Sequence, residues 1–176
     1  MFQLLRHFLR KKLPYQTEKQ LPQGNYQDFV LPHLNMDWAT TYEFAFMAKR
    51  HCAAVCVCNG RLYLSGGKKK ELFPAIHGKI GNGPVFSLSK AQPWLQRRKL
   101  RSYEELKAAL ASGHPYAILM ANHIWDLHWV LAVGWREYDD GPCYIHIHDG
   151  WHSSADRWYR LDKGAEWLSA YELYLP

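Results

Sequence analysis

The sequence lacks the features of a membrane-spanning chain and of a nucleotide-driven transporter. No run of about 18 apolar residues occurs, so no transmembrane helix is expected. No glycine-rich phosphate-binding loop ending in Gly-Lys-Ser/Thr occurs, so an ATP-driven exporter is not encoded here. The apolar run at the N-terminus is interrupted by Arg6 and Arg10 and has no small-residue cleavage pattern, so we do not expect a secretory signal.

Cysteine is scarce and poorly spaced for disulfides. Three of the four cysteines, Cys52, Cys56 and Cys58, crowd into seven residues, and the fourth is Cys143. This pattern is typical of reduced thiols, which predicts a reducing, cytoplasmic location. His146 and His148 with a nearby Cys or Asp could form a zinc site, but no CxxC or HExxH spacing supports it. We therefore expect no metal and no cofactor.

The length and the charge are those of one globular domain. At 176 residues, with 48% hydrophobic and 22% charged residues, we expect a single domain over residues 1–176. The net charge of +6 is concentrated in Arg6–Lys12, Lys68–Lys70 and Arg97–Arg101. Short basic runs are typical of solvated faces; weak binding to an anionic polymer or membrane surface is the alternative. No specific nucleic-acid binding is expected, and the sequence does not predict the oligomeric state.

The first part of the chain predicts an arm followed by helices. The stripe Phe2, Leu5, Phe8 and Leu9 has helical period, typical of a docked helix or, alternatively, of a membrane-surface helix. Residues 13–37 are rich in proline and loop residues, which predicts a wrapping arm rather than a separate domain. Residues 38–64 contain few helix breakers and predict helices, with a break near His51. Residues 65–70 and 80–85 predict polar loops.

The second part predicts one helix and then strands. Ser102 and Glu105 form a capping box that begins a helix running to about residue 112, where Gly113 ends it. Apolar or alternating segments predict strands over residues 116–120, 128–135, 144–148, 158–161 and 171–175. A turn around Asp139–Pro142 makes 128–135 and 144–148 an antiparallel hairpin. Helices followed by strands predict an α+β fold.

Cys52 is the candidate nucleophile. Basic residues precede it, and the small residues Ala53 and Ala54 follow, as at a helix start that packs closely. A helix N-terminus lowers the pKa of a thiol and favours the reactive thiolate. Cys56 and Cys58 lie further along the same apolar segment and are more simply core residues. On the residues alone, a core role for Cys52 is an equal alternative.

His128 and Asp149 complete a candidate catalytic set. His128 opens one predicted strand and Asp149 ends the next, so antiparallel pairing could bring them together. A carboxylate there would fix the tautomer of the imidazole. The order Cys, His, Asp follows the nucleophile, base and orienter logic of thiol proteases. His51 is a poor base because neighbouring side chains diverge. His123 and Asp126 are more simply solvated loop residues; the alternative is that they line a cleft rim.

These segments together resemble the papain-like cysteine peptidases. The similarity rests on Cys52 with its two alanines, the loop Gly81–Pro84, His128–Val130 with Gly134, and Asp149–Trp151. The branch it most resembles is the bacteriocin-processing (double-glycine leader) peptidases and their stand-alone relatives, over residues 38–161. Those peptidases usually carry a Gln shortly before the cysteine, whereas residues 46–51 contain none, so the second oxyanion donor is missing from its usual place.

The resemblance implies a fold and a function. The fold would be papain-like, with an arm over 1–37 and a core over 38–176 whose nucleophile helix packs on a C-terminal antiparallel sheet. The function would be that of a cysteine peptidase or amidase acting on a peptide or other amide through a thioester. It also implies substrate-binding residues, namely Asn82, Gly83, Trp129 and Trp151. The alternatives are an acyltransferase using the same three residues and a papain-like binding domain with an impaired oxyanion hole.

Overall fold

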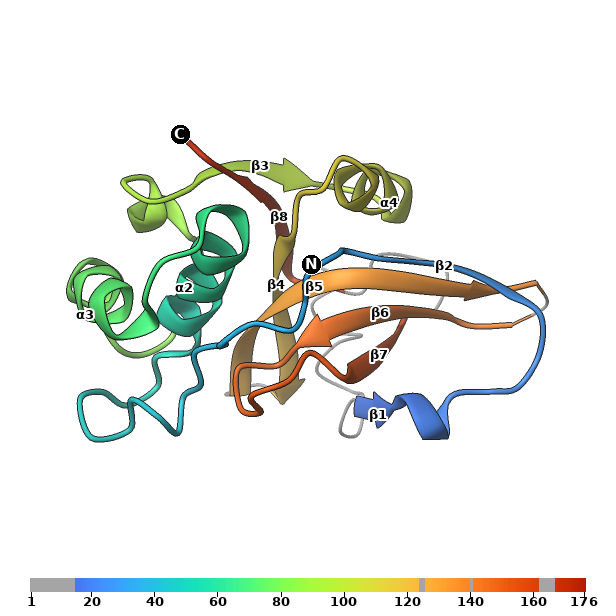
Figure 1. Cartoon of the computed structure of the whole chain (residues 1–176), viewed down its shortest axis with the longest axis horizontal. Helices are drawn as coiled ribbons and strands as arrows, with labels where there is room; N and C mark the ends of the chain where they lie inside the picture. The colour runs from blue at the N-terminus through green and yellow to red at the C-terminus, as the bar shows by residue number, and fades with distance from the viewer. Residues whose placement is uncertain (1–14, 124–125, 140, 162–166) are drawn as a thin grey trace.

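Three α-helices and one antiparallel sheet form the part of the chain that the structure, a computed structural model, describes: residues 15–123, 126–139, 141–161 and 167–176 (Figure 1). The helices are α2 (Cys52–Ser65), α3 (Lys69–Ile80) and α4 (Tyr103–Ala111), with short 3-10 turns η1 (Glu18–Gln20) and η2 (Ser89–Ala91). This confirms the predicted α+β class. The helix predicted from Phe2, Leu5, Phe8 and Leu9 lies outside the described residues.

The sheet has eight strands in the order β1-β7-β6-β5-β4-β8-β3, and β2 also pairs with β5. Every pairing is antiparallel. The long strand β5 is central to the sheet, because it pairs with β4, β6 and β2 along different parts of its length. The strands are β1 (Tyr15–Thr17), β2 (Tyr26–Val30), β3 (Gln96–Leu100), β4 (Tyr116–His123), β5 (Asp126–Tyr138), β6 (Cys143–His148), β7 (Arg157–Leu161) and β8 (Ser169–Tyr174).

Two local predictions are confirmed, the first of them in part. The Ser102 hydroxyl accepts a hydrogen bond from the Glu105 amide at 3.2 Å, and α4 follows as predicted. The Glu105 carboxylate accepts from the Arg101 amide at 2.8 Å, one residue before the Ser102 amide that a capping box uses, so the predicted box is present in its Ser102 half. The predicted hairpin is also present, because β5 and β6 pair out to Glu137 opposite Cys143.

The prediction of helices over residues 38–64 is wrong for its first half. The segment before α2 forms turns, in which the Thr40 hydroxyl accepts from the Glu43 amide at 3.1 Å. Such side-chain-to-backbone bonds compete with helix formation. Phe44 turns inward and stacks on Phe73 with ring centres 3.9 Å apart. Arg50 has a φ of +53°, which interrupts the chain just before α2 begins.

Several elements were not predicted. Helix α3 contains Pro74, which sequence reasoning treats as a breaker, yet it forms because Phe73, Ile76 and Ile80 bury one face. Strand β3 is short and basic, so it lacks a strand pattern. The predicted arm supplies β1 and β2, which add to the sheet rather than only wrapping it.

A buried arginine holds the arm on the sheet. Arg136 on β5 is 7% exposed, and its guanidinium contacts Asp28 at 2.8 Å and Glu18 at 2.7 Å. The same guanidinium lies over the rings of Tyr26, at 4.0 Å, and Trp158, at 4.7 Å. A desolvated cation needs such partners, and here the arm provides both carboxylates.

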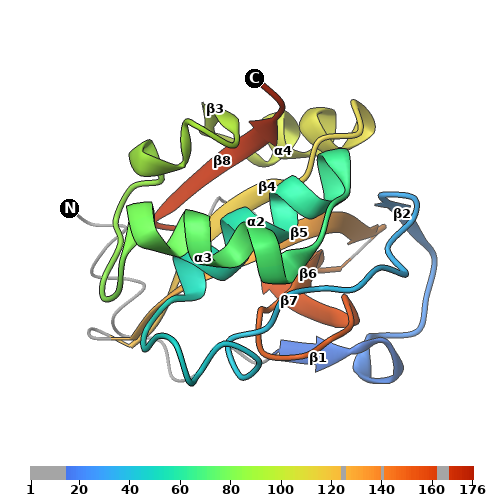
Figure 2. The same ribbon diagram turned by 60° about the vertical axis from the view of Figure 1, so that its left-hand side comes forward.

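Helix α2 lies between α3 and the sheet. It packs against β5 and β4 on one side and α3 on the other (Figures 1 and 2). Residues on all sides of the helix are therefore buried, including Ala53, Ala54, Val57 and Cys58. This placement carries the N-terminus of α2 to the start of β5. No helix among the described residues combines the length and apolar character needed to cross a membrane.

Gly134 provides a test of this junction. A Cβ atom there would lie 2.6 Å from the Phe29 carbonyl oxygen and 3.2 Å from the His146 Cβ, because β2 and β6 flank β5 at this point. We expect Gly134→Ala to lower the free energy of unfolding by about 1–3 kcal/mol in urea denaturation. The control is Gly78→Ala in α3, whose added Cβ meets nothing within 4 Å. That change should be neutral or stabilising by up to about 1 kcal/mol; equal effects would contradict the packing described.

Candidate active site

Cys52 is the first residue of α2, as predicted. His51 precedes it as the N-cap, and the Val55 amide donates to the His51 carbonyl at 3.1 Å. The half-buried Cys52 sulfur lies 4.0 Å from the carbonyl oxygen of Leu127. Leu127 immediately precedes His128 on β5, so the thiol lies beside the strand that carries the predicted base. The positive end of the helix dipole favours a thiolate at this position.

His128 is held by a main-chain oxygen. Its side chain is 3% exposed, and its Nε2 lies 2.6 Å from the carbonyl oxygen of Asp149. Its ring stacks on Trp151, with ring centres 4.2 Å apart and planes 12° apart. A carbonyl oxygen can only accept, so Nε2 must carry the proton of this bond. In the neutral ring, Nδ1 is then the nitrogen whose lone pair can accept a proton, so it can act as a base.

His128 and Asp149 are hydrogen-bonded, through the Asp149 main-chain oxygen, and the Asp149 carboxylate contacts the turn that follows. We expected it to bond to His128, but it accepts from the Trp151 amide at 2.8 Å, the His152 amide at 3.0 Å and the His152 Nδ1 at 2.7 Å. Burial opposes ionisation of this 1% exposed group, yet these hydrogen bonds, led by that from the His152 amide, keep the pKa of Asp149 below its ordinary value. The carboxylate therefore fixes the turn that lays Trp151 on His128.

A buried polar contact ties α2 to β6 behind these residues. Asn59 of α2 donates to the Ala39 carbonyl at 3.0 Å, accepts from the Ala39 amide at 2.8 Å and lies 3.1 Å from His148 Nδ1. The Gly150 amide also lies 3.3 Å from that Nδ1. Because both neighbours donate, Nδ1 of His148 is an acceptor and its ring is neutral. Sequence reasoning missed this contact; the signal was a lone Asn in an otherwise apolar helix.

The loop predicted to bind substrate packs beside the nucleophile segment. The Asn82 side-chain oxygen lies 3.3 Å from the Lys49 amide and 2.9 Å from His77 Nε2. The Gly83 amide donates to the Arg50 carbonyl at 3.0 Å, two residues before Cys52. Asn82 itself is exposed. The loop thus forms the surface next to the start of α2.

Trp129 does not have the predicted position. It is 1% exposed, its ring N–H donates to the Val85 carbonyl at 2.6 Å, and its ring stacks on Tyr171. A side chain without accessible surface cannot touch a ligand. The prediction that Trp129 binds substrate is therefore wrong, since the residue instead fastens the loop to the core. Its neighbour His128 points to Asp149, as alternation along a strand requires.

The other three cysteines are less accessible than Cys52. Cys56, Cys58 and Cys143 are all buried, whereas Cys52 is half-buried. Burial raises the pKa of Cys58 to about 12 and raises that of Cys56 well above its ordinary value. Neither of these two thiols is ionised at neutral pH.

The remaining histidines do not gather around a metal. His146 stacks on Trp158 and His148 on Trp38, each with its ring packed against an indole. Within the described ranges, no group of three His, Cys, Asp or Glu side chains could hold a metal ion. His51 lies 3.1 Å from the Thr41 carbonyl through its Nε2, and burial lowers its pKa. The side chains of His123 and Asp126 lie outside the described part of the structure.

The fold is similar to that of a solved cysteine-peptidase-like structure. That chain, from Bacillus anthracis, is provisionally described as a C39-like peptidase; the TM-score is 0.56, the sequence identity is 16%, and the match covers 84% of this chain and 98% of the other. No protein-family model and no curated protein matches the sequence. The comparison therefore supports a C39-like, cysteine-peptidase type of fold and leaves function to the residues.

The buried His148 makes the site sensitive to acid. Burial lowers the pKa of His148 from 6.5 to about 4. Below pH 6.5 His148 is protonated in the unfolded chain but stays neutral in the folded chain. The free energy of unfolding therefore has its full value above pH 6.5 and decreases as the pH falls toward 4. We expect His148 to remove about 2 kcal/mol of the free energy of unfolding between pH 7.5 and pH 5.

The measurement is urea denaturation at several pH values, with His148→Asn as the comparison. The Asn oxygen can replace Nδ1 as an acceptor but does not titrate. On acidification the variant should lose less of its free energy of unfolding than the original chain. Its stability should still fall to a smaller extent with pH, because burial also lowers the pKa values of His51 and His146. Parallel curves for the two proteins would refute the role of His148.

Proposed function

We propose that this protein is a cysteine hydrolase of peptide or other amide bonds, with Cys52 as nucleophile and His128 as base. The observation that carries the proposal is the 2.6 Å bond from His128 Nε2 to the Asp149 carbonyl, beside a helix-start cysteine. This bond leaves Nδ1 as the proton acceptor, and the Cys52 sulfur lies next to the same strand. The similarity to a structure described as a C39-like peptidase supports the reaction class.

The acylation step uses one proton relay. Nδ1 of His128 takes the thiol proton, and the thiolate of Cys52 attacks the amide carbon. The oxyanion that forms lies at the N-terminus of α2, where the first amides of a helix have no intrahelical acceptor. The imidazolium then gives its proton to the leaving amine, the C–N bond breaks, and a thioester remains on Cys52.

Deacylation repeats the relay with water. Nδ1 takes a proton from a water molecule as its oxygen attacks the thioester carbon, and the proton returns to the sulfur when the C–S bond breaks. The products are a carboxylic acid and the regenerated thiol. Throughout the cycle the Asp149 carbonyl keeps its bond to Nε2–H and stabilises the imidazolium. Asp149 is therefore a positioning residue.

The oxyanion site has one identified donor, the backbone amide at the start of α2. Residues 46–51 contain no Gln, and loss of one oxyanion donor typically costs about 2.7–4 kcal/mol of transition-state stabilisation. We therefore propose a slow hydrolase. Asn82, Gly83 and Trp151 are the proposed substrate contacts, since the loop lies beside Arg50 and the indole covers His128. Cytoplasmic location and independence of a cofactor remain predictions.

The nucleophile is tested by alkylation. At neutral pH, iodoacetamide should modify Cys52 at least about tenfold faster than the other three cysteines, because reactivity follows thiolate fraction and access. Peptide mapping by mass spectrometry gives the order. His128→Ala should slow the modification of Cys52, whereas Cys56→Ala, one turn along the same helix, should leave it unchanged. Preferential modification of Cys143 or equal modification of all four would contradict the proposal.

The proposal that the Asp149 main-chain oxygen orients His128 is tested by the turnover of a fluorogenic peptide mixture. Where a carboxylate fixes the tautomer of a catalytic histidine, its change to an amide costs about 10⁴-fold in kcat. Here Asp149→Asn keeps the main-chain oxygen and an acceptor for the turn amides, so we expect a loss below about tenfold. His128→Ala should lose about 10⁴-fold or more. Equal losses for these two variants would show that the carboxylate is the orienter after all.

A further inference from the structure

One continuous segment of this protein carries positive charge and no negative charge. Residues 72–102 contain six Lys and Arg and no Asp or Glu, so this segment alone carries an excess equal to the net charge of +6. In the structure it runs from within α3 through η2 to the end of β3. A segment without acidic residues favours a positive potential over the surface that it forms.

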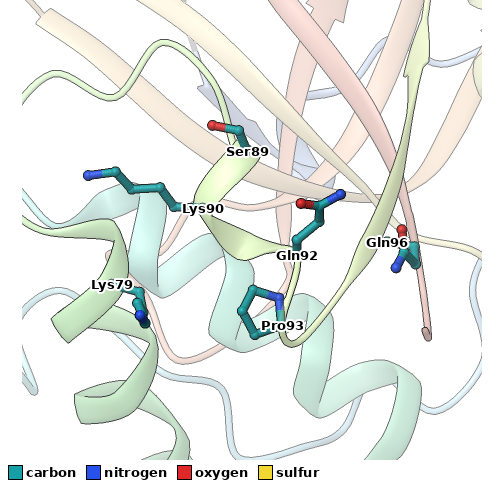
Figure 3. A pocket seen from close by; sticks show the side chains of 6 residues that line it. All are labelled: Lys79, Ser89, Lys90, Gln92, Pro93 and Gln96. Carbon is teal, nitrogen blue, oxygen red and sulfur yellow. The ribbon is translucent and has the colours of Figure 1, made fainter.

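Part of this segment lines a hollow. The hollow has a volume of about 550 Å³ and lies between the end of α3, η2 and the start of β3 (Figure 3). It is open to solvent, and its lining residues are Lys79, Ser89, Lys90, Gln92, Pro93 and Gln96. All of these offer cations, amides or a hydroxyl except the proline. Between the described residues, no carboxylate lies within ion-pairing distance of either lysine.

The wall of the hollow is fixed by buried neighbours. Leu88, Ala91 and Leu95 are buried, and the Trp94 and Leu95 amides donate to the Ala91 carbonyl at 2.9 and 3.0 Å. The turn around η2 therefore joins β3 in a defined geometry. A surface fixed in this way loses little conformational freedom when it binds.

The hollow opens onto an edge of the sheet. Strand β3 ends the strand order and pairs with β8 alone among the described strands (Figure 1). Alternate residues of an edge strand direct their N–H and C=O groups away from the sheet, where they can pair with another chain. Arg98 on this strand is engaged by Glu172 at 2.6 Å, whereas Lys99 is exposed and has no carboxylate partner among the described residues.

We propose that the hollow and the β3 edge form a docking surface for an acidic, extended segment of a partner polypeptide. The edge would pair with the main chain of that segment, and Lys79 and Lys90 would face its carboxylates. The lining contains no aromatic ring on which a base could stack, so the surface suits a peptide better than a single-stranded nucleic acid.

The test measures binding to the full-length protein by fluorescence anisotropy at low salt. The probe is a labelled ten-residue peptide of alternating Glu and Thr, compared with a Gln-Thr peptide and with a ten-nucleotide oligo-dT. We expect the acidic peptide alone to bind, and Lys79→Gln with Lys90→Gln to weaken it by about fivefold. The matched control, Lys19→Gln with Lys70→Gln, removes two exposed charges elsewhere and should change the affinity less than about twofold.

Hydrogen exchange then locates the contact. Amides of residues 96–100 should exchange more slowly when the acidic peptide is bound, because a strand added to β3 protects them. Equal weakening by both lysine pairs would mean attraction by overall charge and would overturn the proposal. Failure of the acidic peptide to bind, tighter binding of oligo-dT, or unchanged exchange in β3 would overturn it as well.

Discussion

The candidate site depends on the hydrogen bond between His128 Nε2 and the main-chain oxygen of Asp149. The register of β5 with β6 produces it, because Leu131 lies opposite His148 and the chain then continues past His128. Asp149 directly follows β6, so its main-chain oxygen reaches His128 without the selection of an Asp149 side-chain rotamer. The Asp149 carboxylate is thereby left to organise the following turn, which covers the imidazole with Trp151. The register of β5 with β6 thus determines that Nε2 of His128 carries the proton and that Trp151 packs on the same ring.

The same register connects His128 to the helix that begins at Cys52. His148 precedes Asp149 on β6 and meets Asn59, which lies two turns along α2 from Cys52. Asn59 also forms hydrogen bonds with the N–H and C=O groups of Ala39, so the segment that precedes α2 is attached to the same asparagine. Asn59 uses both its amide group and its side-chain oxygen in these bonds, and buried hydrogen bonds of this kind hold their elements in one arrangement. Helix and strand are therefore positioned together.

Sequence patterns predicted the elements of this site but not the atoms that meet. The small residues after Cys52 predicted the start of a closely packed helix, and the alternation after His128 predicted a strand of the hairpin. Both predictions were possible because helix packing and strand pleating restrict the types of side chain at these positions. A main-chain hydrogen bond leaves no such signal, so the pattern could only suggest the Asp149 side chain. Trp129 was misplaced for a related reason: an indole beside a candidate base is equally consistent with a cleft and with a core. Helix α3 was missed because Pro74 masks a stripe whose partners lie elsewhere in the chain.

The proposed arrangement of His128 and Asp149 is tested most directly by the tautomer of His128, determined by ¹⁵N NMR of the imidazole nitrogens. The spectrum should be recorded on the Cys52→Ala protein above pH 8, where the ring is neutral and no thiol can share its proton. We predict that Nε2 carries the proton, which it donates to the Asp149 carbonyl, and that Nδ1 is unprotonated. A proton on Nδ1 would contradict it, because Nε2 could not then donate to a carbonyl oxygen and the proposed base would be blocked.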